Sequence, residues 1–179
     1  MNIKNISLQD SRSITMLVDS EKNVVIFPYS QTKEPVKLPH GTVERTWNTA
    51  YFPIELKYPY TNVDLAQKIE YGIEQWDKHE CYKNFSGRNT FEEKYYGVKG
   101  FKNAVKGVKH FSIGWNEISG KYIYVSLPFK RGYTYFGVGR TFLPSDADWI
   151  DFANEVIKFI NMDYSEFGAF KTYKNRFNI

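Results

Sequence analysis

The sequence predicts a single α+β domain over residues 1–179, with two main helices packed on a mixed or antiparallel β-sheet. Strand-like runs precede and separate two helical stretches, and no linker or low-complexity tract divides the chain. Helices grouped on one face of such a sheet are typical of the α+β class. A chain of 179 residues buries roughly 70% of its unfolded surface, so the fold needs no disulfide or metal.

A strand-proline-helix unit occurs twice in the chain. The helical segment DLAQKI at 64–69 is echoed by DFANEV at 151–156, and every counterpart lies 87 positions later, as Phe152 does after Leu65. Each copy follows an extended run, a proline at 59 or 144, and a polar stretch suited to helix capping. We therefore expect helices over about 62–79 and 147–161, and a fold built around these two units.

The start of the first helix carries a capping signal. Thr61 and Asp64 form a T-x-x-D start, in which the hydroxyl accepts a backbone N–H and the acid faces the positive end of the helix. Apolar residues at helical spacing predict one buried face, formed by Leu65, Ile69, Ile73 and Trp76. Gly72 lies inside this pattern and costs about 1 kcal/mol relative to alanine, which indicates a close approach of helix and sheet.

The remaining segments predict strands joined by loops. Two hairpins are expected, one from 13–19 with 23–29 and one from 109–117 with 121–128, the second alternating apolar and polar residues around Ser119-Gly120. Residues 49–58 and 132–143 have strand character, whereas 31–48 and 82–96 are expected to be irregular. Residues 97–107 are compatible with either a short helix or a strand.

Composition and charge favour a soluble cytoplasmic protein. The lone cysteine, Cys81, cannot form an internal disulfide, which favours a reducing compartment. The N-terminus lacks the apolar run of a signal peptide, and no stretch approaches the roughly 20 apolar residues that span a bilayer. Aromatic residues make up 18% of the chain, which suits both a heavy core and a recognition surface.

A weak catalytic signal is the pair Glu55 and Lys57. An E-x-K on a strand is half of a metal-dependent nuclease signature, in which the acid binds Mg²⁺ and the lysine positions water. A further acid is needed, and Asp19 is the available candidate; an exposed salt-bridging strand face explains the pair equally well. The three histidines are scattered, so we expect no metal site, and the glycines near 97–107 match no phosphate-binding motif, so we expect no cofactor.

Nucleic-acid binding is a further alternative. Basic and aromatic residues alternate in 130–136 and 167–177, and such residues stack on bases and contact phosphates. The sequence pI of about 8.9 and net charge of +4 are milder than in most dedicated nucleic-acid-binding domains.

The second half of the chain carries a set of short motifs. YYGVKGFK at 95–102 precedes a strand ending in proline, IYVSLP at 123–128, and TFLP at 141–144 leads into an acid-capped helix. Over roughly 50–160 this order resembles the CdiI family, the immunity proteins of bacterial contact-dependent growth inhibition systems. The chain departs from the family pattern at Gly100, where serine is common, and at Phe152, where leucine is usual.

The resemblance implies a cytoplasmic protein that neutralises a toxin by binding and has no catalysis of its own. The implied partner is the C-terminal toxin domain of a large secreted contact-dependent inhibition protein, commonly a nuclease, with no membrane and no direct nucleic-acid partner.

Because nuclease toxins tend to be basic, a local acidic patch is expected to meet the toxin. The candidates are Glu92, Glu93 and Tyr95 after the first helix, and Asp146 and Asp148 at the start of the second; capping and loop solvation are the alternatives. If the loop after the first helix is an interface, Glu92→Lys with Glu93→Lys is expected to weaken toxin binding without unfolding the protein.

Overall fold

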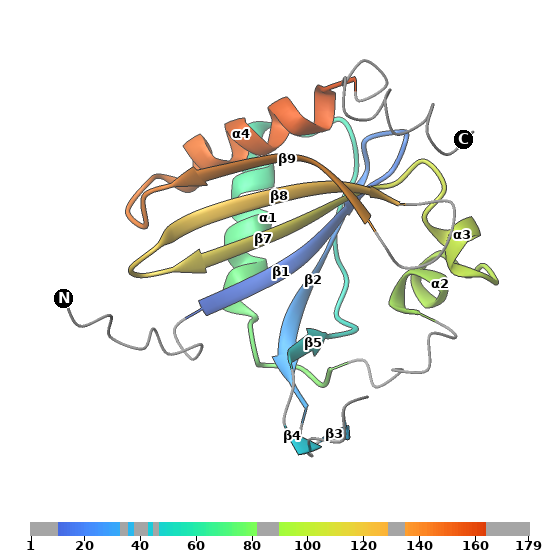
Figure 1. Cartoon of the computed structure of the whole chain (residues 1–179). Coiled ribbons are helices and arrows are strands. Elements are labelled where there is room, and N and C mark those ends of the chain that lie inside the picture. The colour runs from blue at the N-terminus through green and yellow to red at the C-terminus, as the bar shows by residue number, and fades with distance from the viewer. Residues whose placement is uncertain are drawn as a thin grey trace.

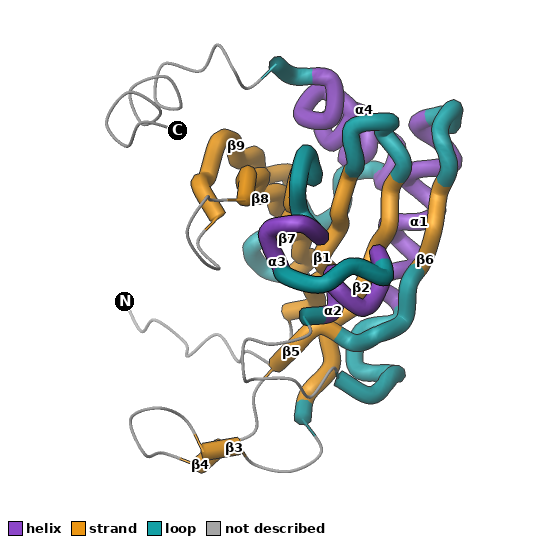
Figure 2. Tube along the Cα trace, turned by 90° about the vertical axis from the view of Figure 1, so that its right-hand side faces the viewer, coloured by secondary structure: helices purple, strands orange, loops and turns teal. Residues whose placement is uncertain are grey.

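The fold is a twisted sheet with helices on both faces. The computed structural model describes residues 11–32, 36–37, 43–44, 47–81, 90–128 and 135–163. Figure 1 views the sheet with α1 behind it and α2 and α3 at one side, and the side view in Figure 2 shows α1 to the right of β1 and β2, with α4 above.

Along the chain, six strands are followed by three helices, then by three more strands and a last helix. The strands are β1 (Ser11–Val18), β2 (Val24–Gln31), β3 (Val36–Lys37), β4 (Val43–Glu44), β5 (Trp47–Thr49), β6 (Ile54–Leu56), β7 (Lys109–Asn116), β8 (Gly120–Pro128) and β9 (Tyr135–Leu143). The helices are α1 (Asn62–Glu74), α2 (Phe91–Tyr96), α3 (Phe101–Ala104) and α4 (Trp149–Asn161).

Seven strands form one sheet in the order β5-β2-β1-β7-β8-β9, with β6 also paired to β2. Every pairing in it is antiparallel. The predicted α+β class and both predicted hairpins are confirmed, and β3 and β4 form a separate two-stranded pair.

Two hydrophobic clusters lie on opposite faces of the sheet. Under α1 and α4, the cluster includes Ile14, Met16, Ile26, Phe111, Ile113, Ile123 and Val125 from the strands, all less than 1% exposed. On the other face, Leu17, Val25 and Phe27 pack with Val105 and Val108 near α2 and α3. The alternation follows from the strand period of two, which sends neighbouring residues to opposite faces.

The echo seen in the sequence is present in the structure as two matching helices. Both α1 and α4 are 13 residues long, and their N-caps are Thr61 and Asp148. The buried residues of α1 are Leu65, Ala66, Ile69, Gly72 and Ile73, and those of α4 are Phe152, Ala153, Val156, Phe159 and Ile160. Each pair is separated by 87 positions. The predicted T-x-x-D start is confirmed as a capping box between Thr61 and Asp64, although α1 ends at Glu74 rather than near 79.

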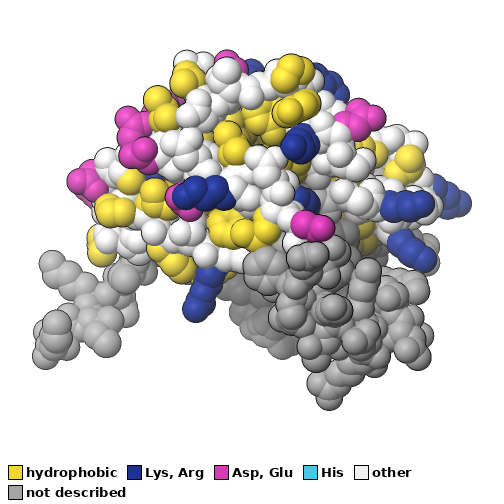
Figure 3. Space-filling view, turned by 90° about the horizontal axis from the view of Figure 1, so that it is seen from above, with side chains coloured by type: hydrophobic (Ala, Val, Ile, Leu, Met, Phe, Trp, Pro, Cys, Tyr) yellow, Lys and Arg dark blue, Asp and Glu magenta, His cyan; other side chains and the backbone are white. Residues whose placement is uncertain are grey.

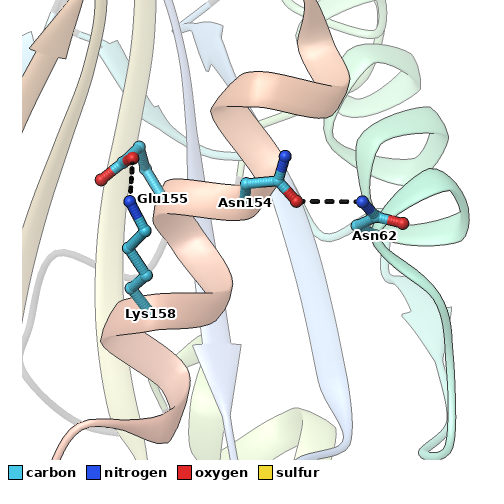
Figure 4. Close-up of polar contacts among 4 residues, drawn as sticks. All are labelled: Asn62, Asn154, Glu155 and Lys158. Carbon is cyan, nitrogen blue, oxygen red and sulfur yellow. Dashed lines mark hydrogen bonds and ion pairs between the residues drawn. The ribbon is translucent and has the colours of Figure 1, made fainter.

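The two helices lie side by side on the sheet and are joined by a polar contact. Asn62 Nδ2 donates a hydrogen bond to Asn154 Oδ1 at 2.9 Å, whereas Glu155 and Lys158 pair within α4 (Figure 4). At the C-terminal end of α4, Lys109 Nζ donates to the carbonyl oxygens of Ile160 and Met162 at 2.5 and 3.1 Å. A lysine is favourable there because the last carbonyls of a helix lack intrahelical partners.

Several predictions about local structure were wrong. Residues 31–48 were expected to be irregular, but β3, β4 and most of β5 lie there. Trp76, expected on the buried face of the first helix, lies after the end of α1 and is half-buried. The region 82–96 was expected to be a loop, but its last part forms α2, which begins at a capping box between Thr90 and Glu93. Residues 82–89 lie outside the described part of the chain. The ambiguous stretch 97–107 contains the short helix α3.

Candidate protein-binding site

A groove lies where the first half of α1 faces the connection from β9 to α4. We call it the α1–α4 groove; its volume is about 490 Å³. Its lining residues are Val63, Ala66, Gln67, Glu70, Lys121, Ser145, Asp146, Ala147, Asp148, Trp149 and Ile150. A smaller cavity of about 220 Å³ adjoins it, and the two share Glu70, Lys121, Ser145 and Trp149.

Carboxylates form the rim of the α1–α4 groove and of the cavity beside it. Glu70 and Glu74 come from α1, and Asp146 and Asp148 from the connection into α4; all four are exposed. Among the described residues, Glu70, Glu74 and Asp146 form no ion pair. Several acidic side chains lie at the left end of the molecule in Figure 3, whereas Lys and Arg side chains predominate at the right end. On the face drawn in Figure 3, the charge is therefore unevenly distributed.

Apolar side chains accompany these acids. Val63 is 43% exposed and Ile150 is 38% exposed, and both line the groove. An apolar surface next to unpaired charge is a usual composition for a protein-binding surface, because burial of the apolar part contributes affinity and the charges contribute orientation and on-rate.

Lys121 forms the inner wall of the groove. It is 2% exposed, and its ammonium donates to the carbonyl oxygens of Ser145 and Ala147 at 2.6 and 2.5 Å. The ammonium also lies 4.6 Å from the centroid of the Trp149 ring. Burial lowers the pKa of Lys121, and the nearby carboxylates of Asp146, Asp148 and Glu70 oppose that shift. Lys121 therefore holds the segment that carries Asp146 and Asp148 against the start of β8.

The two predicted acids at the start of the second helix both line the groove. Asp148 is the N-cap of α4 and accepts a hydrogen bond from the backbone N–H of Ile150 at 2.6 Å. Its carboxylate thus has the capping role that was the alternative to partner binding. Asp146 is exposed and is not the N-cap.

The other predicted acids do not form a surface patch. Glu92 and Glu93 are 3% and 8% exposed. The Glu93 carboxylate accepts from the backbone N–H groups of Thr90 and Gly100 at 2.8 and 2.6 Å, so it joins the start of α2 to the turn before α3. Because both side chains are buried, each lysine substitution would place an ammonium in a buried site, so Glu92→Lys with Glu93→Lys is now expected to destabilise the fold.

Tyr95 makes a specific contact instead of lying free. Its hydroxyl donates to Glu55 Oε1 at 2.7 Å, and its ring packs edge-on to Phe27 in the second cluster. Burial, followed by the contact with Glu55, raises the pKa of Tyr95. Tyr95 therefore lies on the opposite face of the sheet from Asp146 and Asp148, and the five predicted residues do not form one site.

The residues of the nuclease alternative have structural contacts in the fold. Glu55 is the acceptor for Tyr95, and Asp19 caps the β1–β2 turn by accepting from the backbone N–H groups of Glu21 and Asn23, each at 2.9 Å. Within the described ranges, no three His, Cys, Asp or Glu side chains are grouped as metal ligands.

His79, His110 and Cys81 belong to no group of metal ligands among the described residues, and His40 lies outside the described part of the chain. His79 stacks on Phe52 at 3.7 Å between ring centroids, and burial lowers its pKa. Burial lowers the pKa of His110 to about 4. Cys81 is buried, and its backbone forms an isolated antiparallel β-bridge with Ala50. Residues 130–134 and 167–177, which carry the nucleic-acid alternative, lie outside the described part of the chain.

Three members of the site were missed from the sequence. Glu70 belongs to the groove, and Glu74 to the cavity beside it, because α1 lies beside α4, which no local pattern shows. The position of Lys121 could have been predicted, because Lys121, Ile123 and Val125 are alternate residues of one strand and therefore point to the same face of the sheet. Ile123 and Val125 are fully buried. A lysine in that register is expected on the buried face.

Comparisons with known proteins bear on the fold. No protein-family model matches this chain, and no curated protein matches it. A solved structure from Neisseria meningitidis, NMB0488, described as a protein of unknown function, is similar with a TM-score of 0.54 and 11% sequence identity. The match covers 90% of this chain and 98% of that one, so the two proteins share the fold over nearly their whole lengths. No described helix combines the length and hydropathy that crossing a bilayer requires.

Proposed function

We propose that this protein is a cytoplasmic immunity protein of a bacterial contact-dependent growth inhibition system. It binds and neutralises the C-terminal toxin domain of a large secreted protein, a nuclease, and acts without catalysis. The observation that carries the proposal is the α1–α4 groove, where exposed Val63 and Ile150 lie beside carboxylates that form no ion pair among the described residues. The sequence motifs at 95–102, 123–128 and 141–144 supply the family resemblance.

The groove suits a basic partner. The carboxylates of Glu70, Glu74 and Asp146 attract the cationic surface with which a nuclease holds its polyanionic substrate. Inhibition then needs no chemistry, because a partner seated on that cationic surface excludes nucleic acid from it. Despite a net charge of +4, the polarity shown in Figure 3 lets the molecule present its acidic end to such a toxin.

The first test is co-expression with the toxin domain encoded beside this chain. The expected result is a stoichiometric complex and restored growth of the toxin-expressing cell. If the neighbouring gene encodes no toxin, or its product forms no complex and kills the cell regardless, the immunity proposal is wrong.

A second test concerns the groove. Glu70→Lys with Asp146→Lys is expected to lower the association rate about tenfold at low salt, because like charges meet at the interface. Asp148→Asn removes a charge but keeps a good N-cap residue, so its effect reports the charge alone. Glu21→Gln, in the exposed β1–β2 turn, is the matched control and should leave the rate unchanged. Unaltered rates in the groove variants would exclude this surface as the interface.

A further inference from the structure

The strand β9 is the outer edge of the seven-stranded sheet. It is nine residues long and pairs on one side with β8. No hydrogen bond joins its other side to any described residue. Since alternate residues of a strand direct N–H and C=O groups to the same side, this edge presents a row of donors and acceptors that pair with no described residue.

The composition of β9 does not protect this edge. Natural edge strands are usually short or carry several charges or a proline, which discourages pairing with other chains. The run Tyr135–Leu143 contains no proline and one charged residue, Arg140. A long, charge-poor edge in a soluble protein is expected to serve as a pairing site.

The face of the sheet away from α1 and α4 carries an aromatic platform at this edge. Register places Tyr124 opposite Arg140 and Tyr122 opposite Phe142. The rings of Tyr122 and Tyr124 are 5.3 Å apart, and those of Tyr124 and Phe142 are 5.8 Å apart in an edge-to-face contact. Phe142 is 56% exposed and Tyr124 is 43% exposed, so the platform remains open to a partner.

Arg140 defines the charge that a partner has to supply. It is exposed, and it forms no ion pair with any described residue. Cross-strand neighbours of opposite charge stabilise a pairing, and like charges destabilise it. A second copy of β9 brings another arginine and no acid, because Tyr135–Leu143 contains none.

We propose that the partner adds a strand to β9, with an acidic side chain next to Arg140 and an apolar one next to Phe142. The inference rests on the proposed function, since the strand is assigned to the toxin domain. The two surfaces are continuous: β9 ends at Leu143, and Ser145 and Asp146 already line the α1–α4 groove. Main-chain hydrogen bonds along β9 provide affinity, and Arg140 and Phe142 select the side chains of the added strand.

The test compares hydrogen exchange in the free protein and in its complex with the co-expressed toxin domain. The expected result is at least tenfold slower exchange of the outward β9 amides in the complex, because free edge amides exchange readily and paired ones do not. Arg140→Glu should weaken the complex about tenfold without a change in thermal midpoint, since the residue is exposed. Lys102→Glu, an exposed lysine of α3, is the matched control for charge and should have little effect.

The outcomes separate the two proposals. A complex that forms with unchanged β9 exchange and unchanged affinity in Arg140→Glu overturns the strand addition but leaves the immunity function standing. Slower β9 exchange with rising protein concentration and no toxin would assign the edge to a second copy, and so would also overturn it. If no complex forms, the proposed function fails and the inference fails with it.

Discussion

At matching positions α1 carries Gly72 and α4 carries Phe159, and the two helices meet the sheet in opposite ways. A Cβ added to Gly72 would lie 2.8 Å from Ile26 Cγ2, so α1 approaches the sheet through the missing side chain. At the contact of α4, the large residue Phe159 is on the helix, and the glycine is Gly139 of β9. A Cβ added to Gly139 would lie 2.5 Å from the Phe159 ring. The two helices have the same pattern of apolar residues, but that pattern does not determine whether the glycine that allows close packing lies in the helix or in the strand.

The largest effect is expected from Phe159→Ala. Phe159 is 9% exposed and packs over Gly139, so its loss leaves a cavity that the glycine strand cannot fill. The expected cost is about 3 kcal/mol in the free energy of unfolding, measured by urea denaturation. Lys158→Ala, one position earlier and mostly exposed, should change stability by less than about 0.5 kcal/mol. Equal effects at the two positions would contradict the packing described here.

The reciprocal substitution in α1 is Gly72→Ala. Overpacking against Ile26 costs about 1–3 kcal/mol, and better helix propensity returns about 1 kcal/mol, so a net loss of about 1 kcal/mol is expected. The double-mutant cycle with Ile26→Ala sharpens the result. Once the Ile26 side chain is truncated, Gly72→Ala should become neutral or stabilising. Additive effects of the two substitutions would show that contact with Ile26 is not the reason that a side chain at position 72 is unfavourable.

The two N-caps differ less. Thr61→Ala and Asp148→Ala should each lower the free energy of unfolding by about 1 kcal/mol, because each leaves backbone donors of a helix unsatisfied. The cap of α1 is also expected to make stability depend on pH, through Asp64. Hydrogen bonds from the backbone N–H and the hydroxyl of Thr61 lower the pKa of Asp64 from 3.8. This depressed pKa contributes stability that is present above 3.8 and is lost as pH falls through the folded-state pKa.

Asp64→Asn should therefore flatten the acid limb of the stability curve, as measured by thermal unfolding between about pH 5 and 2. If Asp64→Asn loses stability at low pH to the same extent as the unaltered protein, Asp64 does not contribute to that loss.

The smallest effect concerns the polar contact between the helices. A double-mutant cycle on Asn62 and Asn154, each changed to alanine, should give a coupling of about 0.5 kcal/mol. The exposed pair of Glu155 and Lys158 within α4 should give about 0.3 kcal/mol, and only that value should fall with added salt. A salt-dependent coupling between the asparagines would be inconsistent with a neutral hydrogen bond.

The comparison of the helices also shows what the sequence could supply. The spacing of apolar residues and the T-x-x-D start predicted both helices and the cap at Thr61, because these are local signals. The structure of α2 was missed because it has 6 residues, too few for an apolar period, although Thr90 and Glu93 already formed a capping-box pattern.

Only some residues of the candidate site could be predicted from the sequence. Asp146 and Asp148 were found because polar residues gather before a helix. Glu70 and Glu74 were not, since their membership depends on α1 lying beside α4. Glu92 and Glu93 were assigned to the surface on residue type, but both are buried, and Glu93 accepts hydrogen bonds from the nearby backbone N–H groups of Thr90 and Gly100.

Lys109 and Lys121 hold opposite ends of α4, and this has a chemical consequence. Both ammonium groups are bonded to backbone carbonyls, and burial lowers both pKa values. Lys121 is 2% exposed, whereas Lys102 is exposed, so an amine-reactive reagent is expected to acylate Lys121 much more slowly than Lys102. The rate at which Lys121 is labelled thus measures how often the connection into α4 leaves β8.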